Sequence, residues 1–412
     1  MTLDFIKREG TIDDQMKPKL FSFFSGAGFL DFGFESESYP VVFVNELSSD
    51  FLSAYKHARS KLGIRPPEFG YHNDSIMEFR KPEAEKSLRE KMRLARKGGN
   101  LIGFVGGPPC PDFSIGGKNR GCRGDHGKLS RSYVELICHH RPDFFLFENV
   151  KGLWSTRRHR RFYDQLKAEL IQSGYKLTDR LINCIQYGTP QDRERIILLG
   201  FRTGALRQAG ESRYADNLPF PWDTRALFPG RQAFSYEWPK TAAFREEADL
   251  IAPSNIPLHL TVESWFRRNE VWNHPNAGHC FKPRAGFRKF MTVAEGDDSK
   301  KSFKRLHRWR YSPTACYGNN EVHLHPYRPR RINVAEALAI QSLPKEFELP
   351  PYLSLSAMFK IVGNGVPFLA ARMIARSLLD FLKEPYGTHE ADSNQHRSSN
   401  WETSYQACLQ LY

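Results

Sequence analysis

Cys110 is the residue of this chain best suited to covalent chemistry. It lies in the segment 106–114, Gly-Gly-Pro-Pro-Cys-Pro-Asp-Phe-Ser, just past the apolar run 101–105. A thiolate is a strong nucleophile, so a cysteine at a strand end is a candidate for attack on a substrate. The consecutive prolines fix φ and remove two backbone donors, which stiffens the turn. Taken alone, the segment is equally consistent with a proline-rich turn holding a half-buried structural thiol.

An acidic side chain and two basic ones follow at similar positions. Glu148 directly follows the apolar run 144–147, and Arg193 and Arg195 precede the apolar run 196–200. A carboxyl group can bind and protonate a ring as a general acid. Residues two apart on an extended chain point to the same side, so the two arginines could act together. Considered singly, Glu148 is also consistent with a position beside a helix N-cap, and the arginines with a solvated edge.

Residues 20–35 predict a buried strand, a glycine turn and the start of a helix. This arrangement receives nucleotide-like cofactors at a helix N-terminus. A second strand, 41–44, leads to Glu46, which stands 20 residues after Gly26, where an acidic side chain reaches ribose hydroxyls in dinucleotide-type folds. Gly-x-Gly alone occurs in many turns, but together with the strand and the acid it favours a nucleoside-containing cofactor.

The order of these segments resembles that of the DNA cytosine-5 methyltransferases, from about Phe21 to Leu382. The matching segments are Phe-Ser-Gly-Ala-Gly at 24–28, Pro109-Cys110, Glu148-Asn149-Val150, Gln191 with Arg193 and Arg195, 331–336 with Gln341, Leu343 and Pro344, and Gly363-Asn364-x-Val366-Pro367. Six matches in the family order are highly specific. Three positions depart from the family pattern: Ser22 replaces an acidic residue, Phe29 a glycine, and Pro111 a glutamine.

The resemblance implies an α/β, Rossmann-like methyltransferase fold that uses S-adenosyl-L-methionine and releases S-adenosyl-L-homocysteine. It implies that Cys110 adds to carbon 6 of a cytosine flipped out of the duplex. Glu148 then binds the ring at N3 and at the exocyclic amine, Arg195 holds O2, and Arg193 supports that arrangement. The implied cofactor contacts are Phe24, Ser25, Gly26, Ala27, Gly28, Glu46, Asp74, Pro108, Asn364 and Val366. For Asp74 a plain Asx turn is nearly as consistent.

A chain of 412 residues exceeds one typical core and predicts more than one domain. We expect a catalytic and cofactor-binding domain at 1–201 and a smaller, mostly irregular or β target-recognition domain at 202–311. A return segment at 312–383 then completes the catalytic domain, with a final helix over about 355–382 packed on the N-terminal sheet. Residues 384–412 are expected to form a flexible tail.

The charge of the chain favours a polyanionic partner. Lys and Arg number 60 against 46 Asp and Glu, a net charge of +14. Residues 282–310 alternate basic and aromatic residues, which favours a surface facing double-stranded DNA over a solvated charge run. The glycine-rich, basic segment 114–130 predicts a mobile lid on DNA or, equally by composition, a disordered surface loop. The predicted DNA contacts are Ser114, Lys118, Arg120, Arg123, Lys300, Lys301, Lys304, Arg305, Arg308 and Arg310.

The cysteine content and the hydropathy of the chain indicate its cellular compartment. Seven cysteines without a Cys-x-x-Cys pair predict a reduced, cytoplasmic protein. No signal sequence or membrane-spanning run is expected. The spacing of Cys122, His126, Cys138 and His139 fits no zinc pattern, so no metal is predicted.

The best biological interpretation is a monomeric bacterial modification enzyme that acts beside a separate restriction endonuclease, which rests on family analogy. Two alternatives remain. An RNA cytosine-5 methyltransferase acting on transfer RNA shares the motif set, although the long basic insertion favours sequence-specific DNA reading. A catalytically inactive DNA-binding homologue would not need the complete set of Cys110, Glu148, Arg193 and Arg195.

Overall fold

The computed structural model describes residues 18–109, 125–206, 218–246, 251–283, 287–300, 302–315, 317 and 321–383. Within these residues the strands are β1 (Lys19–Phe23), β2 (Val41–Asn45), β3 (Tyr71–His72), β4 (Ile102–Gly106), β5 (Phe144–Val150), β6 (Tyr175–Asn183) and β7 (Glu194–Arg202). The strand predicted at the start of 20–35 and those predicted from the apolar runs at 41–44, 101–105, 144–147 and 196–200 are therefore confirmed. Uninterrupted apolar runs of this length are typical of strands that are buried on both faces.

The helices are α1 (Phe29–Ser36), α2 (Ser49–Lys61), α3 (Pro82–Ala95), α4 (Asp125–His140), α5 (Lys151–Ser155), α6 (Arg157–Gln172), α7 (Thr203–Leu206), α8 (Val262–Arg268), α9 (Phe287–Thr292), α10 (Val334–Ile340), α11 (Leu355–Asn364) and α12 (Phe368–Lys383). Short 3-10 turns are formed by η3 (Ile76–Arg80), η5 (Cys184–Tyr187), η7 (Gln232–Phe234) and η8 (Leu258–Leu260).

One sheet carries the strands in the order β3-β2-β1-β4-β5-β7-β6. The pairs among β1 to β5 are parallel, whereas β7 runs antiparallel to both β5 and β6. From β1 the chain moves to β2 on one side and later returns to β4 on the other. Open α/β sheets bind ligands at such a switch point, outside the carboxyl ends of the strands. The predicted cofactor turn follows β1 and the predicted nucleophile follows β4, so both belong to this edge.

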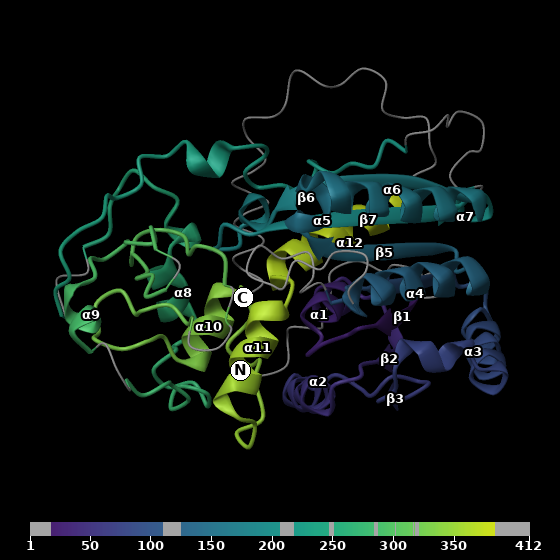
Figure 1. Ribbon diagram of the computed structural model, residues 1–412, viewed down its shortest axis with the longest axis horizontal. Coiled ribbons are helices and arrows are strands. Elements are labelled where there is room, and N and C mark those ends of the chain that lie inside the picture. Colours follow the sequence, from purple (N-terminus) through teal and green to yellow (C-terminus); the bar gives the residue numbers. More distant parts are fainter. Residues whose placement is uncertain are drawn as a thin grey trace.

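Helices cover both faces of the sheet, which gives three layers (Figure 1). Successive strand residues point to opposite faces. Leu20 therefore packs in a cluster with Ile374 and Leu378 of α12, whereas Phe21 packs in a second cluster with Ile137 and Leu166 of α4 and α6. Helices α1 and α2 join the first cluster and α3 joins the second. Both faces of the strands are thus removed from water.

The final helix predicted over 355–382 is two helices, because α11 ends at Asn364 and α12 begins at Phe368. Pro367 stands directly before α12, where its missing N–H and fixed φ are tolerated. Helix α12 returns to the N-terminal part of the chain as predicted, and the Tyr39 hydroxyl donates to the Ala375 carbonyl at 3.0 Å. The stretch Leu355–Lys383 has the length and hydropathy of a membrane span, but 78% of its apolar window is buried inside the protein, as in the core helix of a globular domain.

The smaller lobe, on the left in Figure 1, contains α8, α9 and α10. It is irregular as predicted. In the described part of 203–311, however, the regular elements are short helices, 3-10 turns and isolated bridges such as that between Ala242 and Glu295, not strands.

The boundaries of the smaller lobe differ from those predicted. Leu218 and Phe220 belong to the sheet cluster of α12, so the chain just past residue 202 still packs on the catalytic lobe. Past residue 311, Leu324 bridges Arg305, and α10 packs against α8. The smaller lobe therefore extends into the predicted return segment, and apolar side chains of α8 and α10 share one buried cluster.

Candidate active site

The glycine turn after β1 is tied to the acid that follows β2. Gly26 and Gly28 have φ values of 59° and 78°, a region that favours glycine. The Gly26 N–H donates to Glu46 Oε2 at 2.8 Å, and the Ser48 N–H donates to Oε1 at 2.8 Å. Burial raises the pKa of Glu46, and these backbone donors oppose the shift. The predicted glycine turn and Glu46, the acid predicted to bind the ribose, are thus joined by a hydrogen bond.

Arg59 of α2 holds this turn, and sequence reasoning missed it. Its buried guanidinium donates to the carbonyls of Ala27 (3.3 Å) and Gly28 (2.7 Å) and to the Glu35 carboxylate (2.8 Å). A Cβ on Gly28 would lie 2.6 Å from the guanidinium, so only glycine fits here. An arginine in an otherwise ordinary amphipathic helix carries no local signal of burial, because its partners lie on another element.

The two described departures from the family pattern have compensating neighbours. Ser22 is buried and donates a hydrogen bond to Asp31 Oδ1 at 2.8 Å, so a carboxylate still lies beside the end of β1. The Phe29 ring fills space over Gly365, where a Cβ would lie 2.1 Å from the ring. Phe29 can replace a glycine because Gly365 has no side chain.

The other predicted cofactor residues lie around the same edge. Asp74 follows β3 with an exposed side chain, and its carbonyl accepts from Asn45 Nδ2 at 2.8 Å. The carbonyl of the buried Pro108 accepts from Asn149 Nδ2 at 3.3 Å. Asn364 is exposed at the end of α11 and Val366 is buried. Phe24 lies edge-on to Tyr133, and Ser25 bonds the Asn45 carbonyl.

Glu148 and Arg195 form a buried ion pair at the end of β5. Arg195 Nε lies 2.9 Å from Glu148 Oε1, and both residues are 8% exposed. Burial raises the pKa of Glu148, with Arg195 and Arg193 opposing the shift. A Cβ on Gly107 would lie 2.7 Å from Glu148 Oε2, so the strand end that leads toward the predicted nucleophile touches this carboxylate. Such a carboxyl group can exchange a proton at a site shielded from water.

Arg193 is a positioning residue in this structure. Its guanidinium donates to the carbonyls of Ala315 (2.9 Å), Gly363 (2.6 Å) and Gly365 (3.1 Å). These contacts fix the turn that carries Asn364 and Val366 against the catalytic edge. Arg193 thus joins the return segment to the site, and Arg195 forms the ion pair with Glu148.

Six predicted site residues lie outside the described residues: Cys110, Ser114, Lys118, Arg120, Arg123 and Lys301.

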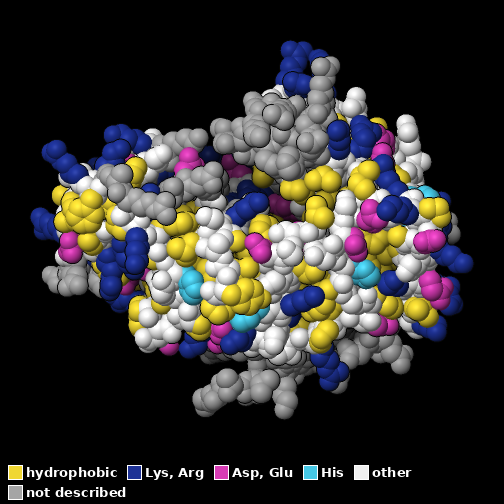
Figure 2. Space-filling model, turned by 60° about the horizontal axis from the view of Figure 1, so that its bottom comes forward, with side chains coloured by type: hydrophobic (Ala, Val, Ile, Leu, Met, Phe, Trp, Pro, Cys, Tyr) yellow, Lys and Arg dark blue, Asp and Glu magenta, His cyan; other side chains and the backbone are white. Residues whose placement is uncertain are grey.

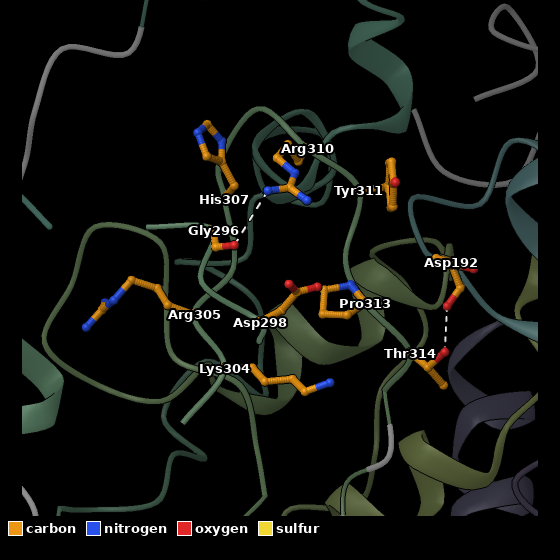
Figure 3. A pocket seen from close by; sticks show the side chains of 10 residues that line it. All are labelled: Asp192, Gly296, Asp298, Lys304, Arg305, His307, Arg310, Tyr311, Pro313 and Thr314. Carbon is orange, nitrogen blue, oxygen red and sulfur yellow. Dashed lines mark hydrogen bonds between the residues drawn. The ribbon is translucent and has the colours of Figure 1, made fainter. Parts of the chain in front are cut away.

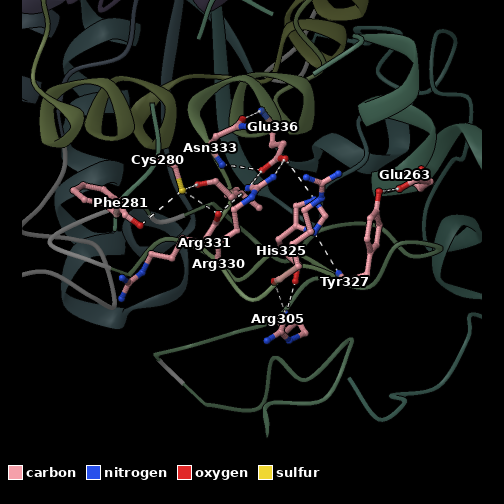
Figure 4. Close-up of polar contacts among 12 residues, drawn as sticks. Glu263, Cys280, Phe281, Arg305, His325, Tyr327, Arg330, Arg331, Asn333 and Glu336 are labelled. Carbon is pink, nitrogen blue, oxygen red and sulfur yellow. Dashed lines mark hydrogen bonds and ion pairs between the residues drawn. The ribbon is translucent and has the colours of Figure 1, made fainter. Parts of the chain in front are cut away.

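Two of the predicted DNA contacts are wrong, because their side chains are buried. Arg305 is fully buried and donates to the carbonyls of Val293 (2.8 Å) and Arg328 (3.2 Å), and also to those of His325 and Phe290 (Figure 4). Burial lowers its pKa to about 10. Arg308 is 5% exposed and makes two hydrogen bonds of 2.8 Å to the buried Glu295 carboxylate. Neither guanidinium is available to a phosphate.

A second buried network in this lobe surrounds Glu336 (Figure 4). Arg330 donates to both of its oxygens at 2.8 and 2.6 Å, and the Asn333 N–H donates at 2.8 Å. Burial raises the pKa of Glu336, but His325 and Arg330 outweigh that effect and hold it well below its usual range. Glu336 belongs to the motif 331–336, which therefore stabilises the smaller lobe.

Two other predicted DNA contacts of this run border a polar cavity. Lys304 and Arg310 line a space of about 310 Å³ together with Asp298 and, from the catalytic lobe, Asp192 (Figure 3). Thr314 donates to the Asp192 carbonyl at 2.6 Å, so the cavity lies where the two lobes meet. Lys300 is exposed nearby in the chain. Lys and Arg side chains also gather on the outer side of the smaller lobe, on the left in Figure 2.

We expect Arg308→Ala to destabilise the protein without changing its affinity for DNA. The variant removes the guanidinium from the buried Glu295 carboxylate and leaves it only a backbone donor, and loss of the cation from such a pair costs about 3–5 kcal/mol. Thermal melts should therefore show a melting temperature several degrees below wild type, while Arg310→Ala melts normally. An unchanged melting temperature together with a shallower salt dependence of DNA binding would contradict the structural role.

The strand order, the glycine turn after β1 and the acid after β2 define the class of protein as a Rossmann-like methyltransferase. A methyltransferase of Entamoeba histolytica has the same fold, with a TM-score of 0.54 at 12% identity over 89% of this chain and 99% of that one. The family profile described as C-5 cytosine-specific DNA methylase matches residues 18–380.

Two curated relatives agree with that match. The Type II methyltransferase M.NmeDI of Neisseria meningitidis serogroup C is 54% identical, over 92% of this chain and 87% of the relative. The Type II methyltransferase M.FnuDI of Fusobacterium nucleatum is 29% identical, over 89% and 95%. The chain belongs to the C-5 cytosine-specific DNA methylases, and it is an enzyme of that family.

Proposed function

We propose that this enzyme methylates a cytosine flipped out of a short, specific sequence in duplex DNA, by way of a covalent adduct with Cys110. The observation that carries the proposal is the buried Glu148–Arg195 pair, 2.9 Å apart, at the carboxyl end of β5. It touches Gly107, three residues before Cys110 in the chain. A thiol, a carboxyl group and a guanidinium are the groups that activation of a cytosine ring requires.

S-adenosyl-L-methionine fits the edge formed by β1, β2 and β4. A Cβ on Gly26 would meet no atom within 4 Å, so there is open space over the turn, beside the Glu46 carboxylate. Phe24 and the backbone of 25–28 would hold the cofactor, Glu46 its ribose, and Asp74 its adenine amine, with Pro108, Asn364 and Val366 around it. When bound, the cofactor would supply an electrophilic methyl group on a sulfonium, with S-adenosyl-L-homocysteine as the product.

Carbon 5 of cytosine is a poor nucleophile until the ring is activated. The Cys110 thiolate adds to carbon 6 while the Glu148 carboxyl donates a proton to N3, so the electron pair of the C5–C6 bond becomes available at carbon 5. Burial raises the pKa of Glu148, which favours the protonated form that this step needs. Arg195 donates to O2. Carbon 5 would then attack the methyl group as the sulfur–methyl bond breaks. A base, water or a side chain, takes the proton of carbon 5, the C5–C6 double bond re-forms and the Cys110 thiolate leaves, while N3 returns its proton to the Glu148 carboxylate.

The relatives named above are Type II methyltransferases, which supports a role in a restriction-modification system. In that role the enzyme would act as a monomer in the bacterial cytoplasm and protect host DNA from a separate endonuclease. Transfer RNA is the alternative substrate.

The substrate can be identified directly. The purified protein is incubated with methyl-labelled S-adenosylmethionine and either duplex DNA or transfer RNA. We expect label in DNA alone, and bisulfite sequencing of DNA from expressing cells then reads the site. Label in transfer RNA alone would replace the proposed substrate, and label in neither would favour an inactive binding homologue.

Lys300 and the two partly exposed basic residues of the cavity can be tested together. If Lys300, Lys304 and Arg310 lie along phosphates, the triple alanine variant should flatten the slope of log affinity against log salt by about 0.9 per lost contact. Single-turnover methylation at saturating DNA should stay close to normal at the same sequence. A wild-type slope would mean a solvated face, and an altered site preference would mean that these residues read bases.

A further inference from the structure

Three arginines at the start of α6 form an exposed patch that the site described above does not use. Arg157, Arg158 and Arg161 are exposed, and among the described residues none of them has a hydrogen-bond or ion-pair partner. Arg161 lies four and three positions after the other two, so the three side chains are neighbours on the helix surface. We call these three residues the arginine patch.

The remaining two residues of the basic run 157–161 have structural roles. His159 is buried and its Nδ1 lies 3.2 Å from the Gly152 carbonyl, which fixes α6 to α5. Arg160 packs over the Trp154 ring, 3.9 Å from its centroid, and bonds Asp164 at 3.1 Å. His159 and Arg160 therefore stabilise the position of α6, whereas the arginine patch faces solvent.

Helix stability does not explain the arginine patch. Cations in the first turn oppose the helix dipole, and the first turn of α6 has no acidic residue to offset them. Like charges four positions apart also repel. A patch that costs stability and has no partner within the described part of the protein is consistent with an anionic ligand.

The arginine patch lies at the catalytic edge of the sheet. Helix α5 joins the end of β5 to α6 and contacts both β5 and β7 (Figure 1). Lys151 of α5 pairs with Glu194, the residue before Arg195, at 2.5 Å. From Glu148 to Arg157 the chain spans at most about 24 Å, because α5 shortens it. Along the axis of a duplex the phosphates of one strand are about 3.4 Å apart, so this reach corresponds to about seven base pairs.

We propose that the arginine patch binds phosphates of the duplex that flank the methylated cytosine. The proposal rests on DNA as the substrate. Guanidinium groups match phosphate oxygens in geometry and charge. The catalytic lobe then contacts the DNA backbone on one side of the flipped base. Lys300, Lys304 and Arg310 of the smaller lobe contact other phosphates of the same duplex. Because phosphates carry no sequence information, the patch strengthens binding to every sequence equally.

The test compares the full-length Arg157→Ala/Arg158→Ala/Arg161→Ala variant with wild type by equilibrium binding over a salt series. On a duplex with long flanks, the variant should bind more weakly, with a slope shallower by up to about 2.7, or 0.9 for each contact. On a duplex trimmed to the recognition site, the two proteins should bind alike. Melting temperature should be unchanged or higher in the variant, because the cations oppose the dipole.

A matched control removes the same charge elsewhere. Lys86, Arg93 and Lys97 are exposed on or just after α3, which Figure 1 shows on the far side of the catalytic lobe. Their triple alanine variant should keep the wild-type slope. Equal losses in both variants, or a wild-type slope in the patch variant, would overturn the proposal, and a lowered melting temperature would assign the patch to folding. If wild type labels transfer RNA and not DNA, the substrate assignment fails separately.

Discussion

Replacing Cys110 with alanine is expected to abolish methylation. Without the thiolate, carbon 6 receives no nucleophile, and carbon 5 stays too electron-poor to accept a methyl group. Alanine is small and costs little packing, so folding and cofactor binding should persist. Label transfer from S-adenosylmethionine measures the activity, and calorimetric binding and thermal melting serve as the other readouts. Substantial turnover in the purified variant would refute the assignment of the nucleophile.

The adduct itself can be trapped to separate chemistry from folding. DNA that carries 5-fluorocytosine at the target has fluorine in place of the proton that must leave, so the enzyme stays bonded to carbon 6. Wild type should give a protein–DNA band on a denaturing gel, and Cys110→Ala should give none. Cys138→Ala is the matched control, since this thiol lies on α4, half-buried against α6, and should trap normally.

Glu148→Gln should slow methyl transfer by a factor on the order of 10² or more, the scale of a lost general acid. The amide keeps the shape of the side chain but cannot protonate N3. Single-turnover kinetics at saturating DNA measure this step. Glu194→Gln is the control, because Glu194 stands beside Arg195 but pairs with the exposed Lys151 instead. A near wild-type rate in Glu148→Gln would reduce the carboxylate to a structural partner of Arg195.

The same residue predicts a pH dependence. Burial raises the pKa of Glu148, so its protonated form persists to higher pH than for an exposed carboxyl group. The rate of methyl transfer should fall as pH rises through that pKa. This decrease should be absent from the pH–rate profile of the residual activity of Glu148→Gln. If the same decrease persists in the variant, it reports the titration of another group.

Most of the sheet could be predicted because the signal is local. Runs such as 41–44 and 144–147 are buried on both faces, and only strands and core helices need such runs. The direction of β7 could not be predicted, because a strand carries the same side-chain pattern whether it runs parallel or antiparallel to its neighbour. The break between α11 and α12 could have been, since Pro367 stands inside the span assigned to one helix.

The residues of the candidate site also differ in how far the sequence could predict them. Glu46 and Glu148 end apolar runs, and the structure places both at the carboxyl edge of the sheet. Arg305 and Arg308 could not be told from partly exposed neighbours such as Lys304, because the groups that bury them are carbonyls and a carboxylate from other segments. Arg59 was missed for the same reason. A charge run shows how many cations a segment has, and tertiary contacts decide which of them face solvent.

The packing of α12 on α1 has a consequence for synthesis. The hydrogen bond from Tyr39 to Ala375 joins residues 336 positions apart. At about 5–20 residues per second, a ribosome needs about 17–67 s to add that stretch. During this time the sheet face that α12 covers has only α1 and α2 from the early part of the chain against it, and the turn that Arg193 fixes does not yet exist. The catalytic edge can therefore be completed only after nearly the whole chain has been synthesised.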